Sequence, residues 1–220
     1  MESNIVLKID AEIGYARGAV IQRVRLDVAP GDVILVRGAN GVGKSTLLST
    51  VAGNRPPLDG TVVVEGHRTD STRAKRHIGY VTDPPNLFEE LTPDEHLKLA
   101  ISLWTAARIP IAGAEISSAI LEGTPDISAS MLSLGQRKRL GLALAVLHRP
   151  WLWLLDEPFN GLDEASSARV RQQIATHLGE GGAVLCATHD EGALGRRDAR
   201  ILELGRDSPI LAKPALVQRD

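Results

Sequence analysis

With 220 residues and a near balance of 25 basic against 27 acidic side chains, the chain is long enough for one α/β domain with a proper core. The balanced charge gives no indication that nucleic acid is a partner, and the single cysteine excludes a disulfide framework within the chain. No apolar stretch approaches the roughly 18 residues of a membrane span, and the N-terminus lacks a signal pattern. We therefore expect a cytoplasmic protein that reaches a membrane only through a partner.

The first part of the chain alternates short apolar segments with turns. Strands are expected over residues 5–9, 20–28 and 33–36. Tyr15 stands next to Gly14 in the first connection, where its ring could stack on a flat base or belong to the core. The residues alone leave both interpretations open.

Residues 38–46 fit the pattern G-x-x-x-x-G-K-[ST] at every constrained position. An apolar, β-branched run precedes this segment and a helical stretch follows it, which is the order that a phosphate-binding loop requires. Its glycines let successive N–H groups turn inward around a polyanion at a helix N-terminus. A chance match in a glycine-rich turn is the alternative. We expect Lys44 to reach the β- and γ-phosphates, the Ser45 hydroxyl to bind Mg²⁺, and the cradle to consist of Gly38, Asn40, Gly41, Val42, Gly43, Lys44, Ser45 and Thr46.

After this loop the sequence predicts strands over 61–64 and 78–81, with a basic run over 68–77 that is most simply a solvated surface. Helical spacing begins after residue 91, with Thr92 or Asp94 as the cap. A second helix is expected over 114–121, and a third begins near Ser133.

Residues 151–155 form a continuous apolar run, typical of a parallel strand buried on both faces, and Asp156 and Glu157 follow it. Carboxylates at that end of a strand face the ligand crevice of an open α/β sheet, and a phosphate cradle needs a second Mg²⁺ anchor. A solvated acidic strand end is the alternative. His189 follows another apolar run, 183–187, and a crevice role or an ordinary surface or core position are equally compatible with this placement.

The remaining elements are a helix over 163–178 and a tail strand over 200–204 that could pair with 209–211. Cys186 is expected to be a buried core thiol. The alternation of strands and helices indicates a mainly parallel sheet.

Taken in order, the cradle, Leu132–Gln136, Leu154–Pro158, Asn160–Asp163 and Thr188–Asp190 resemble the ATP-binding subunit of an ABC transporter over nearly the whole chain. The resemblance implies a P-loop NTPase fold with a RecA-like, mainly parallel sheet, an N-terminal antiparallel β subdomain and an inserted α-helical subdomain. It divides one ABC ATPase domain, 1–220, into a core with the β subdomain, 1–91 and 150–220, and a helical subdomain, 92–149.

By this resemblance Tyr15 stacks on adenine, Asp156 holds Mg²⁺ through water, Glu157 orients or polarises the attacking water, and His189 contacts the γ-phosphate. These roles suit phosphoryl transfer, in which the protein mainly positions an in-line water and neutralises the charge that spreads over the γ-phosphate oxygens. The family's signature loop closes over ATP on the opposite subunit. Ser133, Gly135 and Gln136 match that loop here, and Asp163 matches the segment that links the two sites.

Two positions depart from the family's usual pattern. The third signature position is Leu134 in place of glycine, with Ser133 and Gly135 kept. Asp83 replaces the glutamine that contacts Mg²⁺ and senses the membrane partner, and the sequence around it resembles ATPases of the ABC-2 export type. Function is expected to survive the first change, and the second favours an exporter; a haem-exporter-type ATPase is one possibility.

We therefore expect an ATP-hydrolysing subunit, with ATP and Mg²⁺ as cofactors, that forms a head-to-tail dimer with a second ABC ATPase subunit. It would drive a separate integral membrane permease from the cytoplasmic face, with a coupling helix docked near Asp83 and the helical insertion. The alternative is a soluble ABC ATPase of a cytosolic assembly pathway such as iron-sulfur cluster biogenesis.

Overall fold

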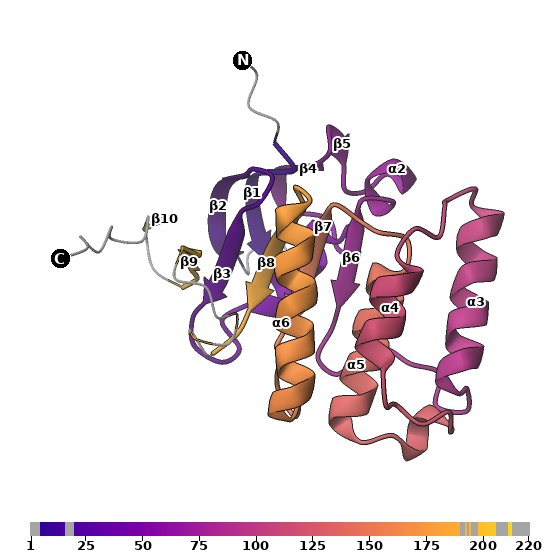
Figure 1. The fold of residues 1–220 in the computed structure, drawn as a ribbon. Helices are drawn as coiled ribbons and strands as arrows, with labels where there is room; N and C mark the ends of the chain where they lie inside the picture. The colour runs from indigo at the N-terminus through magenta and orange to yellow at the C-terminus, as the bar shows by residue number, and fades with distance from the viewer. Residues whose placement is uncertain are drawn as a thin grey trace.

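The computed structural model describes residues 5–15, 20–189, 192, 194, 198–205 and 211–212, which form two sheets with helices around them (Figure 1). The first sheet is antiparallel, with the strand order β2-β1-β4-β5. Its strands are β1 (Leu7–Gly14), β2 (Val20–Val28), β4 (Asp59–Val64) and β5 (His67–Arg68).

The second sheet has the order β10-β9-β3-β8-β7-β6 and is parallel except for β10, which runs antiparallel to β9. Its strands are β3 (Val33–Arg37), β6 (Ile78–Val81), β7 (Leu152–Asp156), β8 (Ala183–Ala187), β9 (Arg200–Glu203) and β10 (Leu211–Ala212). The predicted fold class, a P-loop α/β fold with an antiparallel N-terminal sheet, is thereby confirmed.

The helices are α1 (Lys44–Val51), α2 (Thr72–Lys75), α3 (Pro93–Ala106), α4 (Ala114–Leu121), α5 (Leu134–Val146) and α6 (Glu164–Gly179), with a 3₁₀ turn at Ala129–Met131. Capping residues define where the longer ones begin. The Thr92 hydroxyl accepts from the backbone N–H of Glu95, whose carboxylate accepts from the Thr92 N–H. Thr92 is therefore the cap of α3, one of the two residues predicted for it.

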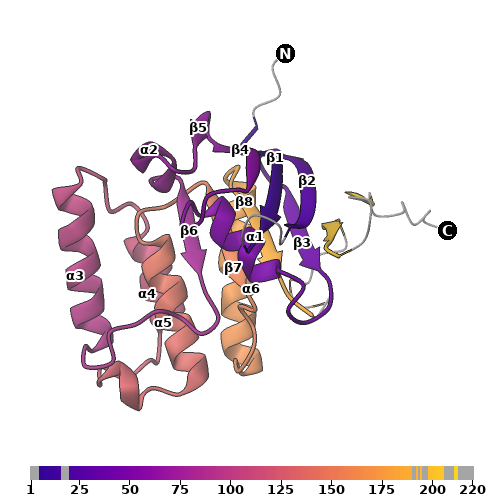
Figure 2. The same cartoon turned by 180° about the vertical axis from the view of Figure 1, so that it is seen from behind.

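The two faces of the parallel sheet are buried by different helices. Ile34 and Val36 pack in one core cluster with α1 and the antiparallel sheet, whereas Val33 and Leu35 pack in another with α5 and α6. This division follows from the strand period of two, which points successive side chains to opposite faces. Figure 2 shows α1 on the side of the sheet opposite to α6, while α3, α4 and α5 lie together beyond β6 (Figure 1).

Two predictions from the sequence needed correction. The first strand runs over 7–14 rather than 5–9, because Ala11 and Ile13 continue the buried face while the alternating Asp10 and Glu12 form exposed ion pairs with Arg23. The basic surface run over 68–77 contains the end of β5 and the one-turn helix α2, whose Ala74 is buried. One helical turn is too short to give a readable period.

The other predicted elements agree closely with the structure. The bounds of β2, β6, α4 and β8 are those predicted, and Leu211 pairs with Leu202 as expected for the tail. Cys186 is buried, as expected. Asp190, Pro209 and Ile210 lie outside the described residues. In the described part of the chain, no helix has the length and apolar character needed to cross a membrane.

Candidate active site

Four of the predicted segments follow four neighbouring strands of the parallel sheet. The phosphate loop follows β3, His189 follows β8, Glu157 follows β7 and Asp83 follows β6. Because the carboxyl ends of parallel strands meet at one edge of a sheet, the topology brings these segments together.

The phosphate loop is shaped by glycine at its junction with α1. Gly43 is the N-cap of α1 and has a φ of 110°, a conformation that L side chains rarely adopt. A side chain at this position would therefore be strained, and its Cβ, 2.2 Å from Cδ1 of Ile21, would also displace that side chain. The helix N-terminus is thereby left open toward the crevice, where its N–H groups can bind an anion.

Lys44 is held inside this loop. Its side chain is only 8% exposed, and Nζ donates to the carbonyl oxygens of Gly38 at 2.9 Å and Ala39 at 3.3 Å. Nε2 of His189 lies 3.3 Å from the same ammonium group. The cation is therefore positioned at the centre of the loop, where a polyanion would be received.

A cavity of about 280 Å³ opens over the loop. Most of the predicted site residues line it: Tyr15, Asn40, Gly41, Gly43, Lys44, Ser45, Thr46, Asp83, Asp156, Glu157 and His189. Gly38 and Val42 are not among the lining residues. The Gly38 carbonyl accepts a hydrogen bond from Lys44, and the Val42 side chain packs against the core. Tyr15 is 53% exposed and its hydroxyl donates to the Gly41 carbonyl at 3.1 Å, so its ring stands at the rim, accessible to a flat base.

The acidic side of the cavity is built around Asp156, which is 5% exposed. Burial raises the pKa of this carboxyl, a hydrogen bond from Ser45 lowers it, and the nearby charges of Glu157 and Asp83 raise it again. The Asp156 carboxylate and the Ser45 hydroxyl that bonds to it are oxygen donors of the kind that suits Mg²⁺, which proteins bind with one or two carboxylates together with substrate phosphates.

Glu157 has an unusual backbone and an unsatisfied side chain. Its φ is +43°, uncommon for a residue with a side chain, and its N–H donates to the Ala187 carbonyl at 2.8 Å. Its Oε1 is buried with no hydrogen-bond partner in the described part of the chain, although Nε2 of His189 lies 3.5 Å away. A buried carboxylate oxygen that lacks a partner can accept a hydrogen bond from a bound water.

The predicted signature residues lie elsewhere. Ser133 is the exposed N-cap of α5, and a Cβ on Gly135 would lie 2.5 Å from the Gly161 carbonyl, so the signature loop packs tightly on the loop before α6. Asp163 is exposed and caps α6 by accepting from the Ser166 N–H at 2.7 Å. Ser133, Gly135, Gln136 and Asp163 are not among the residues that line the cavity.

One residue of the site was missed in the sequence analysis. Lys138 on α5 is only 2% exposed, lies 3.2 Å from Oδ1 of Asp83 and donates to the backbone carbonyl of Glu157. A lysine in a helix is usually at the surface, and the pattern Arg137-Lys138-Arg139 gives no sign that the middle residue is buried.

Comparison with known proteins agrees with this geometry. The family model described as ABC transporter matches residues 21–160. The cytochrome c biogenesis ATP-binding export protein CcmA of Rhodobacter capsulatus is 37% identical over 212 residues, covering 95% of this chain and 90% of CcmA. CcmA of Pseudomonas fluorescens is 33% identical, covering 77% of this chain and 82% of that protein.

Solved structures give the same result. An ATP-binding subunit of an ABC transporter superposes with a TM-score of 0.80 at 26% identity, over 92% of this chain and 88% of the other. The ATP-binding cassette MJ0796, in a dimeric post-hydrolysis state bound to ADP and Pi, superposes with a TM-score of 0.74 at 26% identity, over 90% and 94% of the two chains. The family match covers more than half of the chain and the CcmA match nearly all of it, so the chain belongs to the ABC transporter family as an ATP-binding, ATPase subunit.

Proposed function

We propose that this chain powers export through a separate membrane permease in cytochrome c biogenesis, by hydrolysing Mg²⁺-ATP in a head-to-tail dimer. The cargo system is suggested by the relatives, which are named cytochrome c biogenesis ATP-binding export proteins. The same names favour export over the alternative of a soluble cluster-assembly ATPase. The observation that carries the mechanism is the separation of the signature segment from the nucleotide cavity of its own chain.

The signature segment is exposed, so it can contact another molecule. Ser133 and Leu134 are exposed at the N-terminus of α5, where helix N–H groups favour an anion. Ser133 does not line the nucleotide cavity of its own chain, so the structure gives it no role there. A second copy, turned head to tail, would present this segment to the γ-phosphate of the first, and the dimeric state of the MJ0796 cassette makes such an assembly plausible.

Within each cavity the residues would share the work of phosphoryl transfer. The loop N–H groups and Lys44 would bind and orient the phosphates, while Ser45 and Asp156 would hold Mg²⁺, which supplies charge neutralisation on the phosphate oxygens when bound. Glu157 would accept a hydrogen bond from the attacking water, and His189, 3.5 Å from that carboxylate, would contact the γ-phosphate side.

The test uses Glu157→Gln, which keeps the shape of the side chain and removes its charge. ATP should bind and hydrolysis should stall, so the closed dimer accumulates. Size-exclusion chromatography with light scattering should show a dimer with ATP and a monomer with ADP, and adding Ser133→Arg should abolish the dimer. A Glu157→Gln protein that stays monomeric with ATP at high concentration and with its membrane partner present would overturn the proposal.

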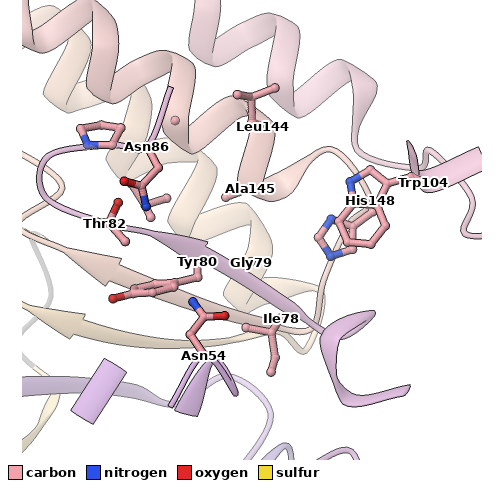
Figure 3. Close-up of a pocket in the computed structure, with 13 residues that line it drawn as sticks. Asn54, Ile78, Gly79, Tyr80, Thr82, Asn86, Trp104, Leu144, Ala145 and His148 are labelled. Carbon is pink, nitrogen blue, oxygen red and sulfur yellow. The ribbon is translucent and has the colours of Figure 1, made fainter. Parts of the chain in front are cut away.

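A groove next to the cavity is the proposed docking site for the permease. It measures about 330 Å³, and Thr82 and Asn86 line one end while the stacked rings of Trp104 and His148 line the other (Figure 3). Thr82 and Asn86 flank Asp83, which faces the nucleotide cavity. A helix bound in the groove would therefore touch the same loop that the nucleotide touches, which supports it as a route for coupling.

Replacement of Ala145, which lines this groove, tests the docking site. Ala145→Arg should fill the groove and abolish co-purification of the permease while the free subunit still binds ATP. Glu115→Arg, on α4 outside the groove, should leave co-purification unchanged. Retention of the permease by the Ala145 variant would contradict the assignment of this groove.

A further inference from the structure

Three basic residues in succession near the start of α5 point in three directions. Arg137 pairs with Glu89, and Arg139 donates to the Glu122 carbonyl at 2.8 Å, so both hold α5 to neighbouring segments of the chain. Lys138, which is more deeply buried than Arg139, points to the Asp83 carboxylate and the Glu157 carbonyl. Successive helical residues are about 100° apart, which is why adjacent side chains can serve such different surroundings.

The contacts of Lys138 place a full charge where burial is costly. With 2% exposure, the ammonium depends on Asp83 and on the Glu157 carbonyl for the interactions that water would otherwise provide. The left-handed conformation of Glu157 is held by three hydrogen bonds: its N–H donates to the Ala187 carbonyl, and its carbonyl accepts from Lys138 and from the Asn160 N–H. Such a conformation persists only where the surroundings determine it.

A second contact fixes the same helix to the same loop. Gly141, one turn beyond Lys138, approaches the loop so closely that a Cβ there would lie 2.8 Å from Cβ of Pro85. The start of α5, the loop that carries Asp83 and the backbone of Glu157 therefore form one packed unit. The N-cap of that helix, Ser133, lies five residues before Lys138 and is the exposed signature serine.

We propose that Lys138 is a positioning residue that couples the chain's own nucleotide cavity to the signature segment it presents to a second copy. Its ammonium group joins Asp83 to the Glu157 backbone, so a change in the position of either group is transmitted to α5. The inference rests on the proposed head-to-tail dimer. The Lys138 side chain itself touches neither the signature serine, Ser133, nor the phosphate loop.

The experiment compares Lys138→Met with Lys98→Met in the Glu157→Gln background. Lys98 is a matched control, because it also pairs with an aspartate, Asp94 at 2.5 Å, but is 73% exposed on α3. Two quantities are measured in each protein: ATP affinity of the monomer, with a fluorescent ATP analogue at dilute protein, and the dissociation constant of the ATP-bound dimer, by light scattering.

Lys138→Met should weaken the dimer at least about fivefold, the lower end of usual coupling between sites, with monomer affinity for ATP changed less than about twofold. Lys98→Met should change neither. A parallel loss of ATP affinity and dimerisation would indicate a structural role only and overturn the proposal, as would an unchanged dimer. If Glu157→Gln alone fails to dimerise, the proposed function fails instead, so the two failures are distinguishable.

Lys138→Met leaves the Asp83 carboxylate without its buried partner, which destabilises the fold, so a second variant is also measured. The double variant Asp83→Asn/Lys138→Met carries no stranded charge and is compared with Asp83→Asn alone, so neither measurement needs the Lys138→Met single variant. If the two residues act through their ion pair, Asp83→Asn alone should already weaken the dimer at least about fivefold, and adding Lys138→Met should change it less than about twofold further. A further loss of about fivefold or more on adding Lys138→Met would show that the two residues act independently and overturn the proposal.

Discussion

Burial lowers the pKa of two histidines that do not line the nucleotide cavity, His148 and His177, to about 4, and each should contribute to the pH dependence of stability. His177 lies in α6 with its ring stacked on Trp153 at a centroid distance of 4.2 Å. Burial lowers its pKa from an ordinary value near 6.5 to about 4, against opposing contributions from the Ala183 carbonyl and the Glu180 carboxylate. A Cβ on Gly182 would lie 2.1 Å from the ring, so little room exists for the ring to leave.

Whether stability falls or rises at low pH depends on which state, folded or unfolded, binds the proton of His177 at the higher pH. As the pH falls through 6.5, His177 is protonated in the unfolded chain while the folded chain keeps it neutral until about pH 4. Unfolding is therefore favoured progressively across that window. At pH 5, about 1.5 units below the pKa of His177 in the unfolded chain, the unfolded chain is protonated and the folded chain is not. This difference in protonation corresponds to about 2 kcal/mol of stability lost relative to pH 8.

His177→Phe keeps a ring on Trp153 and removes the titrating group. Its urea unfolding free energy should fall less between pH 8 and pH 5 than that of the wild type, by about 2 kcal/mol. Val170→Ala, a cavity-forming change at a buried position of the same helix, should lower stability similarly at both pH values. If His177→Phe and the wild type lose the same stability between the two pH values, His177 is not held neutral by burial.

Three further predictions concern the site. Lys44→Ala should abolish ATP binding or turnover in a chain that remains folded by circular dichroism, because it removes the cation at the centre of the loop; normal turnover would refute the cradle. Asp83→Asn should reduce Mg²⁺-dependent turnover more than ATP affinity, measured by phosphate release and by titration; equal losses would place Asp83 among the groups that bind phosphate. Gly135→Ala should weaken the ATP-dependent dimer about tenfold or more, since its Cβ would clash with the Gly161 carbonyl, whereas Gly179→Ala, which has open space, should not.

Much of the fold could be predicted because its signals are local. The β8 and α4 boundaries follow from apolar runs and helical spacing, and the capping pair Thr92 and Glu95 is a readable start signal. The one-turn helix α2 could not be predicted, because its single buried residue, Ala74, does not make a pattern. The end of β1 was misjudged because the alternating acidic residues Asp10 and Glu12 read as the beginning of a loop.

The residues of the site also fall into two groups, those that the sequence predicts and those that it does not. Lys44, Asp156 and Glu157 belong to short motifs whose spacing carries the chemistry, so the sequence predicts them directly. Lys138 carries no such signal, because its position depends on how α5 packs against two loops that are distant in sequence. Its partner Asp83 was singled out only as a departure from the family's pattern, and the structure adds that this carboxylate faces a buried cation 3.2 Å away.

Sheet topology explains why some motifs meet within one chain and another does not. The segments that carry Lys44, Glu157, His189 and Asp83 each follow a strand of one parallel sheet, so folding of that sheet assembles them without further contacts. The segment at Ser133 follows a 3₁₀ turn and opens a helix, so no strand delivers it to that edge. Because it also packs firmly on the loop before α6 at Gly135, a rearrangement that brings it to its own cavity would have to break that contact. In the proposed head-to-tail dimer, a second copy would supply the same group by rigid-body docking and leave that contact intact.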